Sequence, residues 1–390
     1  MNDTAVSTYS TERHLTRRGV LWVGLRCDMR CKFCYDERLG GADKVWLTVA
    51  EATEALDKFR YYYQNTAVDL MGGEPTLHPQ ILEIVRHAAQ IELRPTVITH
   101  GMHLADIERA ARYADAGIHD FLISIHGIGN TVTEIHRRGA DNFAKQVRAL
   151  DNLRILGIPF RFNCTLVQDN LQELEAIAEL AIAKGARVVN FLTFNPYFEW
   201  SVDEEIKFQV RHSEIAPRLA GAIDKLVQAG LEANVRYMPL CQMRGYEPHM
   251  YTGFQLPYDT HEWDYNSWYD CGHAGRQGAD WYREASVRQR DRHHYSYTPG
   301  CQDCAANGIC DGFHAQYLSR FGGEEAVPYS GRAIVDPCHF IKRQRKIEEL
   351  KMTEPAKGDF NARHTASLLT TQFNSAAGHR AGIKLRCPDT

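Results

Sequence analysis

The feature that most constrains the fold is a regular alternation between about residues 19 and 195, where short β-rich segments are followed by amphipathic helical segments. Apolar residues recur three and four positions apart in the helical segments, as on the buried face of a helix. This order is typical of parallel strands joined by crossover helices. We therefore expect an α/β fold, a partial (β/α)6 TIM-like barrel, since six units are too few to close an eight-stranded barrel. The expected strands are 19–26, 67–71, 95–99, 120–125, 159–167 and 187–194, and the expected helices are 48–63, 78–92, 104–117, 142–157 and 171–185.

The alternation weakens after residue 195, where one long helix is expected at about 203–229 and a strand near 233–240. From residue 241 to 345 the chain is rich in Tyr, Trp, His, Gly and Cys with little periodicity, which is typical of a segment ordered by bound metal. We expect five segments: an N-terminal arm at 1–18, the partial barrel at 19–195, a connecting helix and strand at 196–240, a cysteine-rich auxiliary domain at 241–345 and a C-terminal tail at 346–390.

Composition excludes several classes of function. The 390 residues are 44% hydrophobic and 24% charged, which suits a soluble globular protein. The 45 basic and 49 acidic residues give a net charge of −4, which argues against a nucleic-acid partner. No apolar run reaches the ~18 residues of a membrane-spanning helix, and the polar start lacks the apolar segment of an export signal. We expect a cytoplasmic protein with neither a nucleic acid nor a membrane as partner.

Cysteine usage is the unusual part of the composition, with 11 cysteines in a chain that has no export signal. In a reducing compartment, clustered cysteines indicate metal or redox chemistry more often than disulfides. Cys27, Cys31 and Cys34 directly follow the first strand, at the end where α/β barrels place their active sites. Three thiolates can hold three irons of a cubane and leave the fourth open, whereas a structural zinc ion needs a fourth donor that the local sequence does not supply.

This Cx3Cx2C spacing, with Phe33 before the last cysteine, resembles the motif of the radical S-adenosylmethionine (SAM) superfamily. The second expected strand ends in GGEP at the same mouth of the barrel, which strengthens the resemblance. The resemblance implies that the three cysteines hold a [4Fe–4S] cluster and that SAM chelates its open iron. It further implies that Phe33 packs beside the adenine and that the methionine amino group is contacted by Gly72, Gly73, Glu74 and Pro75.

Weaker matches to the same superfamily follow later strands. Ser124, in SIHG, matches a serine at the methionine end of the cofactor, while His126 replaces an acid that the family often has there. Arg138, in HRRG, matches an arginine that pairs with the cofactor carboxylate, although a solvated arginine at a helix start explains it equally well. Asn163 matches a ribose-binding asparagine, and Thr99 lies in THG where the family often has TNG.

A second cysteine group, in Cx2Cx5C spacing, resembles the C-terminal SPASM/twitch-like extension of radical SAM enzymes. His314 stands where that family has the last cysteine of the run, and the partner expected after Cys271 is missing, so one auxiliary cluster is expected instead of two. The expected ligands of this auxiliary [4Fe–4S] cluster are Cys301, Cys304, Cys310 and Cys338. Zinc remains an alternative at this site, since four sulfurs suit either metal. The sequence does not decide whether Cys241, Cys271 or His314 also binds metal.

The resemblance implies an enzyme that reductively cleaves SAM to a 5′-deoxyadenosyl radical, which then takes a hydrogen atom from the substrate. Electrons are expected from a reductant protein such as flavodoxin or ferredoxin, and the auxiliary cluster favours a net oxidation or a rearrangement. Only 26 residues precede Cys27, too few for an N-terminal peptide-recognition domain, so the expected substrate is a small metabolite, sugar or amino-acid-derived natural product. The alternatives are a SPASM-type peptide-modifying enzyme and a non-catalytic iron–sulfur electron carrier. The sequence assigns no side chain to the chemical step itself.

Overall fold

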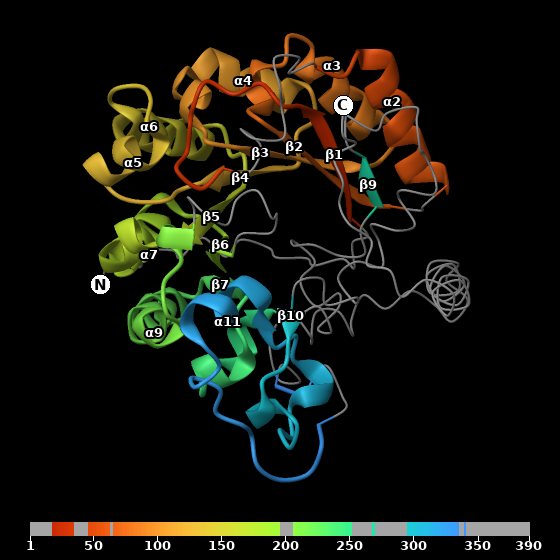
Figure 1. Cartoon of the computed structure of the whole chain (residues 1–390). Coiled ribbons are helices and arrows are strands. Elements are labelled where there is room, and N and C mark those ends of the chain that lie inside the picture. Colours follow the sequence, from red (N-terminus) through yellow and green to blue (C-terminus); the bar gives the residue numbers. More distant parts are fainter. Residues whose placement is uncertain are drawn as a thin grey trace, which may run out of the picture.

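The computed structural model of the chain describes residues 18–34, 46–62, 65–195, 206–251, 267–269, 295–334 and 339–340. Its main element is a nine-stranded sheet of parallel strands in the order β8-β7-β6-β5-β4-β3-β2-β1-β9 (Figure 1). The sheet is open, because its two end strands, β8 and β9, do not pair with each other. The strands are β1 (Arg18–Gly24), β2 (Ala67–Gly72), β3 (Arg94–Thr99), β4 (Asp120–Ser124), β5 (Phe160–Leu166), β6 (Val188–Thr193), β7 (Glu232–Arg236), β8 (Met250–Tyr251) and β9 (Ser267–Tyr269). The expected partial α/β barrel and its six strands are confirmed.

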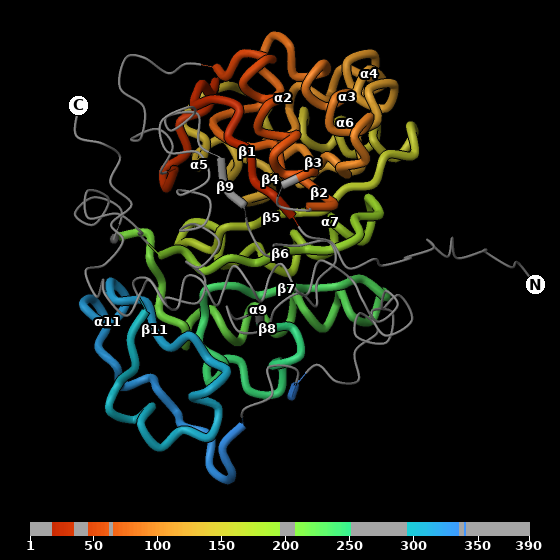
Figure 2. The backbone as a smooth tube through the Cα atoms, turned by 90° about the vertical axis from the view of Figure 1, so that its right-hand side faces the viewer, coloured from red at the N-terminus to blue at the C-terminus, as the bar shows by residue number. Residues whose placement is uncertain are grey.

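Helices cover the outer face of this sheet (Figures 1 and 2). Local sequence sets their ends: Thr48 and Glu51 form a capping box at the start of α2, and Gly185 ends α7 in the left-handed conformation with φ of 78°. The α-helices of this layer are α2 (Val49–Asp57), α3 (Ile81–Gln90), α4 (Ile107–Asp115), α5 (Asn130–His136), α6 (Asn142–Ile155), α7 (Leu174–Lys184) and α9 (His212–Gln228).

Three helices differ from the sequence-based expectation. The helix expected at 48–63 is α-helical only to Asp57 and continues as a π-helical turn over Lys58–Tyr62. The long helix expected at 203–229 begins at His212, because Arg211 is extended. The short helix α5 was not expected, since its sequence shows no amphipathic repeat long enough to predict a helix.

The two faces of the sheet differ in polarity. Val68 and Leu70 point into the apolar core beneath the helices, whereas Asp69 between them points to the inner face. There Asp69 forms an ion pair with Arg18, with charged atoms 2.7 Å apart, and Asp120 forms one with Arg161 at 2.8 Å. All four side chains are buried. These pairs fill the inner face near the start of the strands, so the opposite end, where the cysteine loop lies, is left for ligands.

The cysteine-rich extension lies beside β7 and β8, at the β8 end of the sheet (Figure 2). It contains a two-stranded antiparallel sheet of β10 (Tyr295–Ser296) and β11 (Phe313–His314), followed by α11 (Ala315–Phe321). Tyr317 of α11 accepts a 2.8 Å hydrogen bond from the backbone N–H of His212 and stacks on its ring, with centroids 3.9 Å apart. No helix among the described residues is long and apolar enough to cross a membrane.

Candidate functional site

The loop that carries Cys27, Cys31 and Cys34 follows β1 directly and is tied to the end of α5. The backbone N–H groups of Arg30 and Lys32 donate 3.0 Å hydrogen bonds to the carbonyls of His136 and Ile135. All three thiols are half-buried, and Cys27 Sγ accepts a hydrogen bond of 3.3 Å from the backbone of Met29. Burial and the nearby Glu74 carboxylate raise the pKa of the Cys27 thiol, so a bound cation is needed to keep it ionised.

The number of thiols in this loop fits a cluster better than a structural zinc ion. Three thiolates can bind three irons of a cubane and leave the fourth iron open, whereas a structural zinc ion takes four protein ligands. The loop supplies the three thiolates of Cys27, Cys31 and Cys34.

The GGEP segment lies directly against this loop. Gly73 N–H donates a 2.9 Å hydrogen bond to the Gly24 carbonyl, and Glu74 N–H donates one of 2.7 Å to the Arg26 carbonyl. A Cβ at Gly72, where φ is 116°, would lie 2.0 Å from the Gly24 oxygen, and a Cβ at Gly73 would lie 2.3 Å from the Arg26 oxygen. Glycine is therefore required here for the close approach of β2 to the backbone that leads into Cys27.

The Glu74 carboxylate is buried and accepts hydrogen bonds from other groups of the chain. It accepts hydrogen bonds from Thr76 N–H at 2.9 Å, Thr76 Oγ1 at 2.5 Å, Thr99 Oγ1 at 2.7 Å and His100 N–H at 3.0 Å. The side chain is only 1% exposed, and Pro75 starts the short 3₁₀ turn that supplies Thr76. Glu74 thus joins the ends of β2 and β3, and Thr99, also expected in the site, is part of that junction.

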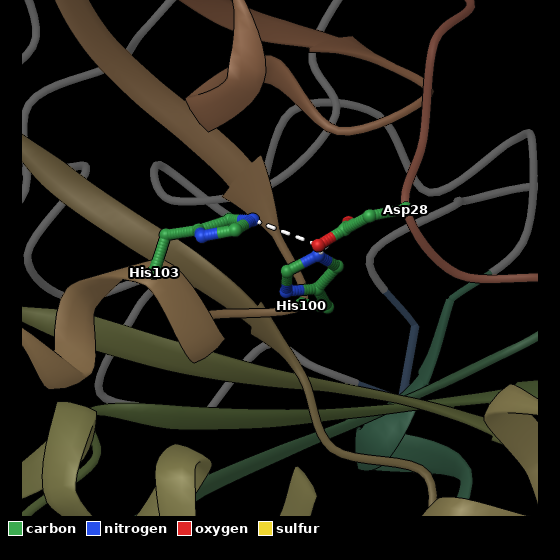
Figure 3. A group of neighbouring side chains, drawn as sticks. All are labelled: Asp28, His100 and His103. Carbon is green, nitrogen blue, oxygen red and sulfur yellow. Dashed lines mark hydrogen bonds and ion pairs between the residues drawn. The ribbon is translucent and has the colours of Figure 1, made fainter. Parts of the chain in front are cut away.

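Asp28, His100 and His103 form a group at the same strand ends that the sequence reasoning missed (Figure 3). His100 Nε2 lies 2.8 Å from one Asp28 carboxylate oxygen, and His103 Nε2 lies 3.0 Å from the other. Burial opposes ionisation of Asp28, but the hydrogen bonds from the two histidines hold the pKa of its carboxyl well below the ordinary value. The group connects the cysteine loop to the Glu74 junction. The sequence signal was a histidine in THG where the family often has asparagine.

The remaining expected residues lie on the cysteine loop, on β4 and β5, and on the loop after α5. Phe33 is buried, with its ring edge-on to His126 at 5.0 Å. Ser124, the last residue of β4, and Asn163, in the middle of β5, are half-buried register partners. Burial lowers the pKa of His126 to about 3, so the residue that replaces the family's acid is a neutral imidazole at pH 7. Arg138 is exposed on the loop after α5.

A second site lies in the extension, where a cavity is lined by Cys301, Cys304 and Cys310. Cys338, expected as the fourth ligand, lies outside the described residues, as does Cys271. His314 is buried and its Nδ1 caps α11 by accepting a 3.2 Å hydrogen bond from Gln316 N–H. Cys241, which the sequence left undecided, lines the same cavity as the three cysteines.

Comparison with known proteins identifies the barrel. Residues 23–181 match the radical SAM superfamily. This segment of the chain is a radical SAM domain. The segment that contains the cysteine loop, GGEP, Ser124 and Asn163 is thus the radical SAM domain, which implies SAM and a [4Fe–4S] cluster as its cofactors.

The relatives of the radical SAM domain differ in activity. A "PqqA peptide cyclase" of Rhodopseudomonas palustris is 29% identical over 184 residues, which are 45% of this chain and 46% of that relative. An "AdoMet-dependent heme synthase" of Methanosarcina barkeri is 29% identical over 161 residues, 41% of this chain and 45% of that relative. The matched part therefore spans about half the length of these curated relatives.

Solved structures share the fold beyond the radical SAM domain. Streptococcus suis SuiB bound to its precursor peptide SuiA aligns with a TM-score of 0.55 at 14% identity, covering 82% of this chain and 76% of SuiB. The AdoMet-bound structure of anSMEcpe aligns with a TM-score of 0.51 at 14% identity, covering 92% of this chain and 96% of that protein. At these identities the likeness shows the fold alone.

Proposed function

We propose that the protein is a radical SAM enzyme with one auxiliary iron–sulfur cluster and that it modifies a peptide. The observation that carries the enzymatic part is the placement of three half-buried thiols beside the Glu74 junction at the open end of the parallel strands. When bound, the barrel cluster and SAM together supply a 5′-deoxyadenosyl radical that removes a hydrogen atom from the substrate. The chain's own residues hold, orient and shield the reactants.

Each barrel residue has a proposed task in that arrangement. Cys27, Cys31 and Cys34 hold the barrel cluster, and Phe33 provides an apolar wall for the adenine. Ser124 and Asn163 offer polar groups to the methionine end and the ribose. Arg138 is exposed and available to the cofactor carboxylate.

Glu74 acts in this proposal by fixing the end of its strand. Its carboxylate already accepts four hydrogen bonds from the chain, which is about the number of lone-pair sites it has. We therefore assign the contact with the methionine amino group to the backbone of Gly72, Gly73, Glu74 and Pro75, with the Glu74 side chain as its positioning group.

A peptide replaces the small metabolite as the favoured substrate because several of the relatives matched in the radical SAM domain are peptide cyclases. The heme synthase relative favours a small molecule as the second candidate.

The test uses the full chain, reconstituted with iron and sulfide under anaerobic conditions and supplied with SAM and dithionite. The probes are synthetic peptides encoded by short reading frames next to the gene. We expect slow 5′-deoxyadenosine release without peptide, faster release with one of them, and a mass change in that peptide. If none of the peptides accelerates 5′-deoxyadenosine release, the proposal of a peptide substrate is wrong. If a protein with an intact barrel cluster releases no 5′-deoxyadenosine, the proposal of an enzyme is wrong and the electron carrier takes its place.

A further inference from the structure

We propose that Cys241 supplies the fourth thiolate of the auxiliary centre, which is then a [4Fe–4S] cluster held by Cys241, Cys301, Cys304 and Cys310. The inference rests on the auxiliary cluster of the proposed function and names its ligands. Cys241 lies in the 3₁₀ turn η7 (Leu240–Met243), shortly after β7, and is about 60 residues before the cysteine run. Sequence spacing alone therefore gives no reason to group it with that run.

The fold brings the four thiols to one cavity. Cys241 lines it together with Cys301, Cys304 and Cys310, and it is half-buried, as those three are. Cys241 lies close enough to Cys301, Cys304 and Cys310 for its charge to bear on theirs. Four thiols on one cavity complete the ligand set of a cubane with no contribution from elsewhere.

Hydrogen-bonding groups of the chain lie against all four sulfurs. Cys241 receives a hydrogen bond from Gln242 Nε2 at 3.3 Å and one from the backbone of Val327. Cys304 accepts a hydrogen bond of 3.3 Å from Tyr329 N–H. Cys310 accepts one of 3.4 Å from Gly312 N–H and another from the backbone of Leu240. The sulfur of Cys301 lies 3.3 Å from Thr298 Oγ1. A neutral thiol is a weak acceptor, so this convergence suits thiolates, and hydrogen bonds to sulfur are a means of tuning a cluster.

The turn that carries Cys241 is clamped to the segment that lies over the cysteine run. Arg244 donates 2.7 Å hydrogen bonds to the carbonyls of Val327 and Pro328 and lies over the Tyr329 ring, 4.3 Å from its centroid. Tyr329 in turn donates to Glu247 at 2.8 Å and to the Leu240 carbonyl at 3.2 Å. The same residue, Tyr329, thus holds the turn of Cys241 through its hydroxyl and contacts the Cys304 sulfur through its backbone.

Four thiolates suit either a cubane or a tetrahedral zinc ion, so the metal content of the reconstituted chain decides between the two.

The experiment isolates the auxiliary centre in the full chain by replacing Cys27, Cys31 and Cys34 with Ala. Iron and zinc are counted after anaerobic reconstitution, and the reduced cluster is examined by electron paramagnetic resonance and Mössbauer spectroscopy. We expect about four irons per chain in this background. Adding Cys241→Ala should remove one iron or the whole cluster, and Cys241→Ser should keep iron but shift the resonance, because an alkoxide replaces one thiolate.

Cys338→Ser and Cys164→Ala are the matched controls, and both should leave the iron content and the resonance of the background unchanged. Cys241→Ser is the decisive variant because a thiol that only packs would leave the resonance unmoved. An unchanged spectrum in Cys241→Ser, loss of the cluster in Cys338→Ser alone, or stoichiometric zinc without iron would each overturn the proposal. Release of 5′-deoxyadenosine by the wild-type chain, measured in parallel, reports on the proposed function separately.

Discussion

The two cysteine sites of this chain differ in how completely the protein encloses a metal centre. The barrel loop offers three thiols, of which Cys27 accepts a hydrogen bond from Met29 N–H. The extension offers four thiols on one cavity, each with a hydrogen-bonding group against it. A three-thiolate cluster keeps one iron open for a ligand, whereas a fully ligated one can only exchange electrons. In the proposed function, this difference assigns SAM binding to the barrel site and electron transfer to the extension site.

The neighbours of the two sites support the same distinction. The barrel loop touches the ends of β2 and β3 through Glu74, His100 and Asp28, all of which lie where a ligand enters an α/β barrel. The extension site is instead closed by Tyr329 and Arg244, which hold backbone segments together. Four experiments can break or sharpen this comparison.

The largest effect is expected from removing the barrel ligands. Replacing Cys27, Cys31 and Cys34 by Ala should lower the iron content from about eight to about four per chain and abolish 5′-deoxyadenosine release. Iron analysis and chromatography of the reaction measure both. If the variant still cleaves SAM, the open iron is not in the barrel loop, and the division of labour between the two sites is wrong.

A change in the extension should separate the two activities. Cys304→Ala removes one auxiliary thiolate, so 5′-deoxyadenosine should still form while the modified substrate does not, because the auxiliary cluster acts after hydrogen abstraction. Mass spectrometry of nucleoside and substrate in one reaction gives both values. Simultaneous loss of both products, with the barrel iron retained, would show that the sites do not work in sequence.

A smaller effect is expected at the Glu74 junction. In Glu74→Gln the new NH2 group faces the backbone N–H of Thr76 or His100, and two donors cannot form a hydrogen bond with each other. We therefore expect a loss of about 1–3 kcal/mol in unfolding free energy. SAM affinity should fall about tenfold, or about 1.4 kcal/mol, with unchanged iron content. Calorimetry and denaturant titration provide the measurements. Exposed Glu83→Gln is the control, and equal SAM affinity in the two variants would contradict the positioning role.

The sequence predicted the sheet well because its signals are local. Alternating segments and glycine caps such as Gly185 depend on neighbouring residues, and they placed all six barrel strands. The cysteine loop and GGEP were found because each is a contiguous motif. Cys241 was left undecided and the group of Asp28, His100 and His103 was missed, because the members of each site come from different segments that only the folded chain brings together. Residues that meet only in the folded chain show no regular spacing along the sequence.

The last prediction concerns His212, through which α9 holds the extension. Burial lowers the pKa of His212 to about 3, both ring nitrogens lack a hydrogen-bond partner in the described structure, and the ring stacks on Tyr317. Because the folded-state pKa lies below the unfolded value of about 6.5, its contribution is fully present above pH 6.5 and declines as the pH falls toward 3. We expect a loss of about 2 kcal/mol between pH 7 and pH 5 from this residue.

His212→Phe keeps an aromatic ring on Tyr317 and removes the titrating group, so the variant should lose less unfolding free energy than the wild type over that pH range. Denaturant titrations of both proteins at pH 7 and pH 5 measure the difference, and the auxiliary cluster's absorbance shows whether the extension detaches first. Equal pH dependence in the two proteins would mean that His212 is not the acid-sensitive contact. If the barrel cluster is then lost before the auxiliary cluster, the cysteine loop is the part of the chain that is less stable to acid.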